Sequence, residues 1–250
     1  MTDQTDKQNI NLTSKVLFYG RTLQEYIKMF DLDLSLWKGC KILDCSSGPA
    51  SFVAEANELD LDVVGCDPLY TDELENLLEC GEQDINTIID FLLSSSLPIS
   101  QKFYTSVDDM KDYATSALRK FLVDYPVGKS EKRYIQAGLP NLPFEDKTFD
   151  LVLSSNFLFV YSKLFIPNLE TLDYQFHLRS VLELIRVAKR EVRIFPMLYI
   201  DGKLHEYAEN LLADLKKEDI VADIRPVEYG SAGKDNIQDN LILCITRAEG

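Results

Sequence analysis

The sequence predicts an α/β fold built on a doubly wound, mostly parallel sheet, with an antiparallel C-terminal hairpin strand and a helical insert after the second strand. Three observations carry this prediction. Short apolar runs alternate with segments whose apolar residues recur at helical spacing. The last two strand-like runs are joined by a loop with the Gly and Asn residues of a hairpin connection. Residues 71–133 contain helical patterns alone.

The N-terminal part supplies the first two predicted strands. Residues 19–30 carry apolar side chains at the spacing of one helix face. Residues 40–45 and 61–68 are short apolar runs, each with an acidic residue near its end, and we expect them to be buried strands. A helix is expected between them, over 50–59. Apolar strands that alternate with helices indicate a parallel sheet covered on both faces.

The helical insert, residues 71–133, interrupts this alternation. Its segments 72–80, 84–96 and 106–125 have helical periodicity, and an Asp or Ser lies near each start, as at helix N-caps. We expect Pro98 and Pro126 to separate these helices from their neighbours.

Strand–helix alternation resumes after the insert. The expected elements are a strand over 133–138, a Pro-rich loop, a strand over 149–156, a helix over 176–190, a strand over 191–198, a helix over 203–218, and strands over 222–230 and 239–247. We therefore expect one domain, residues 1–250, that contains the insert. Ligands of such sheets bind outside the carboxyl ends of the strands, where Asp44, Asp67, residues 138–139 and residues 154–156 fall.

Composition narrows the possible partners. The formal net charge of −15 disfavours binding to nucleic acids and anionic membranes. The basic stretch 186–193 is interpreted as cations at a helix C-terminus. The sequence contains no run of about 18 apolar residues, so no membrane span is predicted. The polar N-terminus does not resemble a secretory signal.

The five cysteines form no CxxC pair, and the chain has only two histidines, so no metal site is expected. Three of the cysteines lie in apolar strand-like runs, where cysteine acts as a small hydrophobe. A reducing cytoplasm is the simplest compartment for such a chain.

Three motifs then occur in a familiar order. Asp44-Cys45-Ser46-Ser47-Gly48-Pro49-Ala50 follows the first strand, Asp67 ends the second, and "GLPNLPFEDKTFDLVLSSNFLF" spans the loop and strand after the insert. With these motifs the chain resembles the class I S-adenosylmethionine-dependent methyltransferases, specifically the methyltransferase-11-like group, over about residues 40–70 and 133–247. The resemblance implies a Rossmann-like sheet, S-adenosylmethionine as cofactor, S-adenosylhomocysteine as product, and methyl transfer to a small or medium-sized molecule. The chain departs from the family pattern at Ser46, Ala50 and Gly138.

The resemblance also implies a set of cofactor-binding residues. Asp44 would hold the cofactor ammonium, directly or through water, and Asp67 the ribose hydroxyls. The Ser46–Gly48 loop and the following helix N-terminus would face the cofactor carboxylate, to which Arg21 could also pair. The full set of candidates is Tyr19, Arg21, Asp44, Ser46, Gly48, Asp67, Pro68, Gly138, Leu139, Ser155 and Asn156.

Structural roles compete with these assignments. Asp44 and Asp67 could cap loops or helices, and residues 154–156 could be ordinary polar groups at a strand end. No catalytic residue is assigned: His177 and Tyr161 are candidate bases by residue type, and His205 is expected to be exposed. The insert could determine acceptor specificity, and its aromatic residues either line a lid or pack the insert against the sheet (Phe91, Phe103, Tyr104, Tyr113 and Phe121).

Three other functions stay open. A methyltransferase-like cofactor-binding or scaffold protein without catalysis would explain the replaced loop residues. Transfer of another group from the same cofactor, such as aminocarboxypropyl, is compatible with every motif. A nicotinamide-dependent oxidoreductase is disfavoured because Ser51 occupies the last position of the Gly-x-Gly-x-x-Gly pattern.

Overall fold

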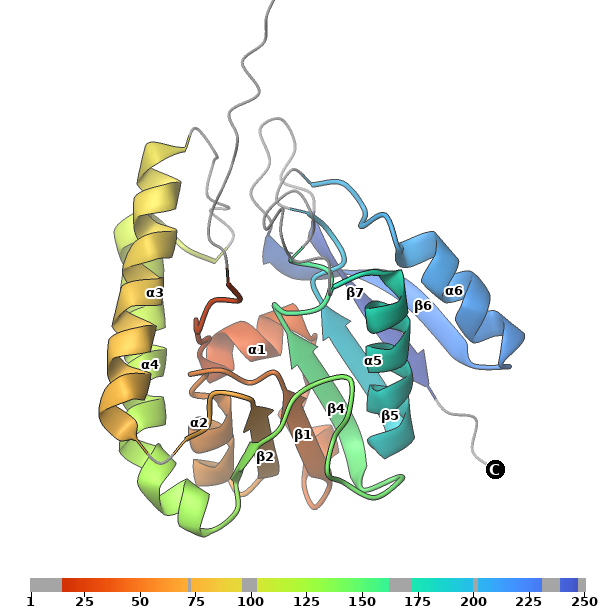
Figure 1. The fold of residues 1–250 in the computed structure, drawn as a ribbon, viewed down its shortest axis with the longest axis horizontal. Coiled ribbons are helices and arrows are strands. Elements are labelled where there is room, and N and C mark those ends of the chain that lie inside the picture. The colour runs from red at the N-terminus through yellow and green to blue at the C-terminus, as the bar shows by residue number, and fades with distance from the viewer. Residues whose placement is uncertain are drawn as a thin grey trace, which may run out of the picture.

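The protein is built around a seven-stranded sheet, seen here in a computed structural model that describes residues 15–71, 73–95, 103–161, 172–199, 202–230 and 239–246 (Figure 1). The strands are β1 (Lys41–Cys45), β2 (Asp62–Asp67), β3 (Tyr134–Gln136), β4 (Phe149–Ser155), β5 (Ala188–Phe195), β6 (Val221–Gly230) and β7 (Asp239–Thr246). Their order is β3-β2-β1-β4-β5-β7-β6. Strands β1 to β5 are parallel, and β7 lies antiparallel between β5 and β6. The predicted fold class is confirmed.

Helices cover both faces of the sheet (Figure 1). One face carries α1 (Leu23–Met29), α2 (Phe52–Glu58), α3 (Leu74–Ser94) and α4 (Val107–Ser130), and the other carries α5 (Tyr174–Val187) and α6 (Ala208–Lys217). A short 3₁₀ helix, η1 (Leu34–Trp37), precedes β1. Alternate strand residues enter opposite cores: Ile42 packs with the first group of helices and Leu43 with the second.

The insert consists of two long helices in its described part, which lie side by side beyond α2 (Figure 1). Two predicted helices, 72–80 and 84–96, are in fact the single helix α3, so their separation was wrong. Asp84, expected near a helix start, is buried within α3 and accepts a hydrogen bond from the Phe18 amide at 2.7 Å. Its position is therefore set by a tertiary contact that periodicity does not reveal.

Pro126 does not end its helix, contrary to prediction, because α4 continues through it to Ser130. A proline inside a helix removes one backbone hydrogen bond and destabilises the helix by about 3 kcal/mol. Tyr125 and Gly128, on either side of it, are buried, and this packing keeps the last turn helical. Pro98 lies outside the described residues.

The boundary between α5 and β5 lies three residues earlier than predicted, since α5 ends at Val187 and β5 begins at Ala188. Of the basic stretch 186–193, only Arg186 lies in a last helical turn, so its interpretation as a helix end was largely wrong. Arg186 instead clamps the loop before β4, donating to the carbonyls of Leu142 and Phe144 and to Asp146. The "LPFED" motif thus has a structural role here.

None of the helices in the described ranges is both long and apolar enough to cross a membrane. The same residues contain no group of three or more metal-ligating side chains, and the five cysteines are free thiols, of which Cys45, Cys66 and Cys244 are buried.

Candidate functional site

A narrow pocket opens at the carboxyl ends of β1, β2 and β4. It is covered by the N-terminal strap, which we define as residues 15–21. The pocket is lined by Val16, Leu17, Tyr19, Arg21, Tyr26, Ser46, Ser47, Gly48, Ala50, Asp67, Ser155, Asn156 and Phe157. The structure thus brings together most of the predicted cofactor-binding residues. The exceptions are Asp44, Pro68, Gly138 and Leu139, which are absent from its wall.

The loop after β1 keeps the backbone shape of a glycine-rich loop although one outer glycine is a serine. Ser46 has φ +47° and Gly48 has φ +53°, both in the left-handed region. A non-glycine residue there costs about 1 kcal/mol, and Ser46 adopts that conformation nonetheless. Ala50 has no positive φ, so its side chain carries no such cost.

The amides of this loop are already used inside the protein. Ser47 donates to the Cys66 carbonyl at 3.0 Å, Gly48 to the Asp67 carboxylate at 3.1 Å, and Ser51 to the Arg21 carbonyl at 3.0 Å. The amide of Ser51, at the start of α2, is therefore not free for a carboxylate. An anion in this pocket must find donors other than the amides of Ser47, Gly48 and Ser51.

Asp44 lies directly behind the pocket wall. Its carboxylate is completely buried and accepts hydrogen bonds from the Tyr26 hydroxyl, at 2.9 Å to Oδ2, and from Ser47 Oγ, at 2.6 Å. Burial raises the pKa of Asp44 to about 7, although these two hydrogen bonds oppose the shift. Both residues line the pocket, and because their hydroxyls give their protons to Asp44, their oxygens can serve a ligand only as acceptors. Sequence reasoning missed Ser47, and it noted Tyr26 only as part of the N-terminal segment.

Asp67 reaches the pocket itself. It is 8% exposed and accepts from the amides of Gly48 and Leu69, the latter at 2.9 Å. Burial raises its pKa to about 6. A carboxylate oxygen can accept more than one hydrogen bond, so both oxygens of Asp67 keep acceptor capacity for a ligand with two hydroxyls.

Arg21 and Tyr19 provide unused donors on the strap side of the pocket. The guanidinium of Arg21 lies 4.5 Å above the Tyr19 ring. Among the described residues, no hydrogen-bond partner is found for its buried Nε and Nη1 atoms or for the buried Tyr19 hydroxyl, while Nε forms a 3.5 Å ion pair with Glu25. Buried polar groups without partners cost free energy. An anionic ligand at this point would satisfy them.

The strap touches the loop after β1 through its backbone. A Cβ atom on Gly20 would lie 2.1 Å from the Pro49 carbonyl oxygen. Only glycine allows this approach, which brings Tyr19 and Arg21 over the pocket.

Pro68, Gly138 and Leu139 lie on the β2–β3 side of the site. A Cβ on Gly138 would meet Pro68 Cγ at 2.6 Å, so these two residues pack directly against each other. Ser155 and Asn156 line the opposite wall, where Asn156 donates from Nδ2 to Ser155 Oγ at 2.8 Å and has φ +50°.

The three candidate bases lie outside the pocket wall. His205 is 2% exposed, so its expected exposure was wrong, and burial lowers its pKa to about 3. His177 is equally buried, bonds the Asp173 carbonyl through Nδ1, and also has a lowered pKa. Tyr161 accepts from the Leu17 amide, and burial raises its pKa to about 12. Both histidines are neutral members of an aromatic cluster with Phe159 and Tyr207.

The hydrogen-bond donors and acceptors of the pocket together fit an amino-acid-bearing nucleoside. Arg21 and Tyr19 match a carboxylate, the oxygens of Tyr26 and Ser47 match an ammonium, and Asp67 matches a ribose diol. The cavity measures only about 40 Å³, room for a few water molecules. A ligand of nucleoside size therefore requires side chains of the pocket wall to rearrange.

Comparison with known proteins gives a relative in sequence and several similar solved structures. No protein-family model matches the chain. Among solved structures, magnesium protoporphyrin IX methyltransferase from Synechocystis PCC 6803 is 11% identical with a TM-score of 0.46, covering 90% of this chain and 81% of that one. The PH0226 protein of Pyrococcus horikoshii OT3 is 13% identical with a TM-score of 0.46, covering 90% and 91%.

The relative in sequence is the uncharacterized protein MJ0045 of Methanocaldococcus jannaschii. It is 31% identical over 208 residues, which make up 83% of this chain and 89% of the relative. The protein described here belongs to the same family as MJ0045.

Proposed function

We propose that the protein transfers a methyl group from S-adenosylmethionine to a small or medium-sized molecule. The observation that carries this proposal is the pair of buried, unpartnered donors on Arg21 and Tyr19, which face the same pocket as Asp67. A cation and a carboxylate that line one pocket match the carboxylate and the ribose of this cofactor.

In this proposal each group of the cofactor has its own partner. Arg21 and Tyr19 bind the carboxylate, since the amides of Ser47, Gly48 and Ser51 are bonded inside the protein. The hydroxyl oxygens of Tyr26 and Ser47 accept from the ammonium, with the negative charge of Asp44 behind them. Asp67 accepts from the ribose hydroxyls, as acids at this position of dinucleotide-binding folds do. Adenine would lie toward Pro68, Gly138 and Leu139.

Bound S-adenosylmethionine supplies a methyl group on a sulfonium centre, whose leaving group is a neutral thioether. The chain then needs only to align the acceptor for in-line displacement and to exclude water. Ser155 and Asn156 form the wall where the acceptor would approach. We assign no general base, since His177 and His205 are buried away from the pocket with lowered pKa values.

We further propose one domain over residues 1–250, within which the insert, residues 71–133, helps to select the acceptor. Phe121 is fully buried against Phe18 and Tyr70, which supports a packing role for this residue. Tyr104 contributes its hydroxyl to the network beside Arg21. A cytoplasmic location and a preference against nucleic acids and membranes are supported by the free thiols and the net charge of −15.

The second candidate is a methyltransferase-like cofactor-binding or scaffold protein without catalysis. The narrow cavity and the internally bonded loop amides favour it. This alternative is compatible with the same fold and the same family, but it predicts that no methyl group is transferred.

Transfer of an isotope-labelled methyl group distinguishes a methyltransferase from a scaffold protein without catalysis. The protein is incubated with trideuteromethyl-labelled S-adenosylmethionine and a small-molecule extract, and products are followed by mass spectrometry. We expect a metabolite that gains one trideuteromethyl group, together with S-adenosylhomocysteine. Gain of an aminocarboxypropyl group would identify the other transfer. Absence of any modified metabolite, with a protein that binds S-adenosylhomocysteine, would support the scaffold alternative.

A further inference from the structure

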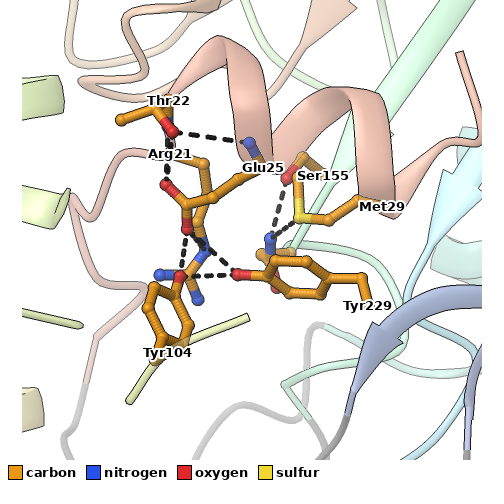
Figure 2. Close-up of polar contacts among 8 residues, drawn as sticks. Arg21, Thr22, Glu25, Met29, Tyr104, Ser155 and Tyr229 are labelled. Carbon is orange, nitrogen blue, oxygen red and sulfur yellow. Dashed lines mark hydrogen bonds and ion pairs between the residues drawn. The ribbon is translucent and has the colours of Figure 1, made fainter. Parts of the chain in front are cut away.

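A buried polar network connects Arg21 with the insert and with β6 (Figure 2). Its centre is Glu25, which is 0% exposed. Glu25 Oε1 accepts from the hydroxyls of Tyr104 and Tyr229, the latter at 3.0 Å, and the two hydroxyls lie 2.6 Å apart. Three segments far apart in the sequence thus meet beside the pocket.

The other oxygen of Glu25 is also satisfied. Oε2 accepts from the Thr22 amide at 2.7 Å and from the Thr22 hydroxyl at 3.0 Å. The first of these bonds, with the Glu25 amide donating to Thr22 Oγ1 at 3.4 Å, forms the capping box of α1. Both oxygens therefore have strong donors other than Arg21. The nearest guanidinium atom, Nε, lies at 3.5 Å, longer than an ordinary hydrogen bond.

This arrangement determines what Arg21 can bind. A buried carboxylate without other donors would draw the guanidinium into a close two-point pair. Because two phenols and Thr22 occupy Glu25, Arg21 stays beside the carboxylate without closing on it. Its Nη1 is left unpartnered at the pocket wall. Glu25 still balances the charge of Arg21, so the cation is held in place.

We propose that Tyr104 is a positioning residue for the cofactor's amino-acid end: by donating to Glu25 beside Tyr229, it keeps Arg21 available to the carboxylate and makes the insert part of the cofactor site. This inference rests on the proposed function. It differs from the expectation that the insert serves the acceptor alone.

Aromatic contacts fix Tyr104 in this position. Its ring packs edge-on against Phe103 at 5.0 Å, Tyr113 at 5.7 Å and Tyr229 at 6.2 Å between centroids. The side chain is 6% exposed. Removal of the hydroxyl alone should therefore leave the ring packing unchanged.

The test compares two ligands on three variants. S-adenosylhomocysteine carries the amino-acid end, and methylthioadenosine has the same nucleoside without it. We expect Tyr104→Phe to weaken S-adenosylhomocysteine about tenfold, the worth of one hydrogen bond to a charged group, and to leave methylthioadenosine unchanged. Tyr229→Phe should show the same selective loss. Tyr113→Phe is the matched control, because in the described part of the chain its hydroxyl hydrogen-bonds Gln24, at 3.5 Å, and no member of the network. It should change neither affinity.

Calorimetry on the intact protein, with melting curves for each variant, reads the result. Equal weakening of both ligands by Tyr104→Phe, or no change in either, would overturn the positioning role while leaving the cofactor site standing. If the folded wild-type protein bound neither ligand, the proposed function itself would be wrong, and this inference with it.

Discussion

Asp44 and Asp67 lie at or next to the carboxyl ends of the neighbouring parallel strands β1 and β2, yet they serve the pocket differently. Asp67 reaches the wall, whereas Asp44 acts through the hydroxyls of Tyr26 and Ser47. Burial raises the pKa of both carboxyls, to about 7 for Asp44 and about 6 for Asp67. Both groups therefore titrate close to neutral pH.

The raised pKa of Asp44 predicts a pH-dependent affinity. A bound ammonium favours the ionised carboxylate, so affinity for S-adenosylhomocysteine should rise as the pH increases from about 6 to about 8. Methylthioadenosine has no ammonium and should show little change between pH 7 and 8. Asp44→Asn should flatten the rise, as measured by calorimetry at several pH values. An equal pH dependence for both ligands would exclude this role of Asp44.

Folding stability should show the opposite trend in the unliganded protein. The fold binds the Asp44 proton more tightly than the unfolded chain, whose pKa is 3.8. The stability that this proton contributes is complete below the unfolded pKa and is lost as the pH rises through about 7. The melting temperature of the unliganded protein should therefore fall as the pH rises from the unfolded pKa of 3.8 to about 7. It should fall less in Asp44→Asn.

At the residue scale, the sequence indicated the acids, the loop and Arg21 because each belongs to a local pattern. Tyr26 could not be assigned to Asp44 from spacing, since the contact joins α1 to β1 across 18 residues. Ser47, three residues after Asp44, could have been suggested as its donor. Glu25 was missed because nothing local shows that it is buried against Tyr104 and Tyr229.

The strap and the loop after β1 act as one element pair, held together at Gly20. Gly20→Ala should push the strap away from Pro49, because the new Cβ would meet the carbonyl oxygen at 2.1 Å. Melting curves check that the fold persists, because Phe18 of the strap is buried in the core. Affinity for S-adenosylhomocysteine should fall about tenfold or more as Arg21 is displaced. Unchanged affinity in a folded Gly20→Ala protein would show that the strap does not contribute to binding.

Elements with strong periodicity were predicted well, and those set by tertiary contacts were not. The strands from β1 to β7 were expected in order, since buried apolar runs identify them. The unity of α3 was missed because Asp84 looks like a cap but binds the strap. Helix α4 passes Pro126 because burial of Tyr125 and Gly128 outweighs the lost hydrogen bond.

In the whole molecule, the pocket is enclosed from two sides. The sheet supplies the acids and the loop, and the strap is tied to α3 by the contacts of Asp84 with Phe18 and Lys15. The insert contributes Tyr104, whose hydroxyl donates to Glu25 beside the pocket residue Arg21. Sequence patterns predicted that the insert is helical and lies outside the family resemblance. They could not show that it shares a buried network with the strap.

The most direct test is calorimetric titration of the full-length protein with S-adenosylhomocysteine, repeated on Asp67→Asn. Asparagine keeps the shape but only one acceptor oxygen, so it can keep the contact with the Gly48 amide or that with the Leu69 amide, and melting curves check that the variant is folded. We predict binding of one ligand per chain, weakened about tenfold to a hundredfold by the substitution through loss of charged hydrogen bonds to the ribose. No binding by the folded wild-type protein, or equal affinity in Asp67→Asn, would contradict the cofactor site described here.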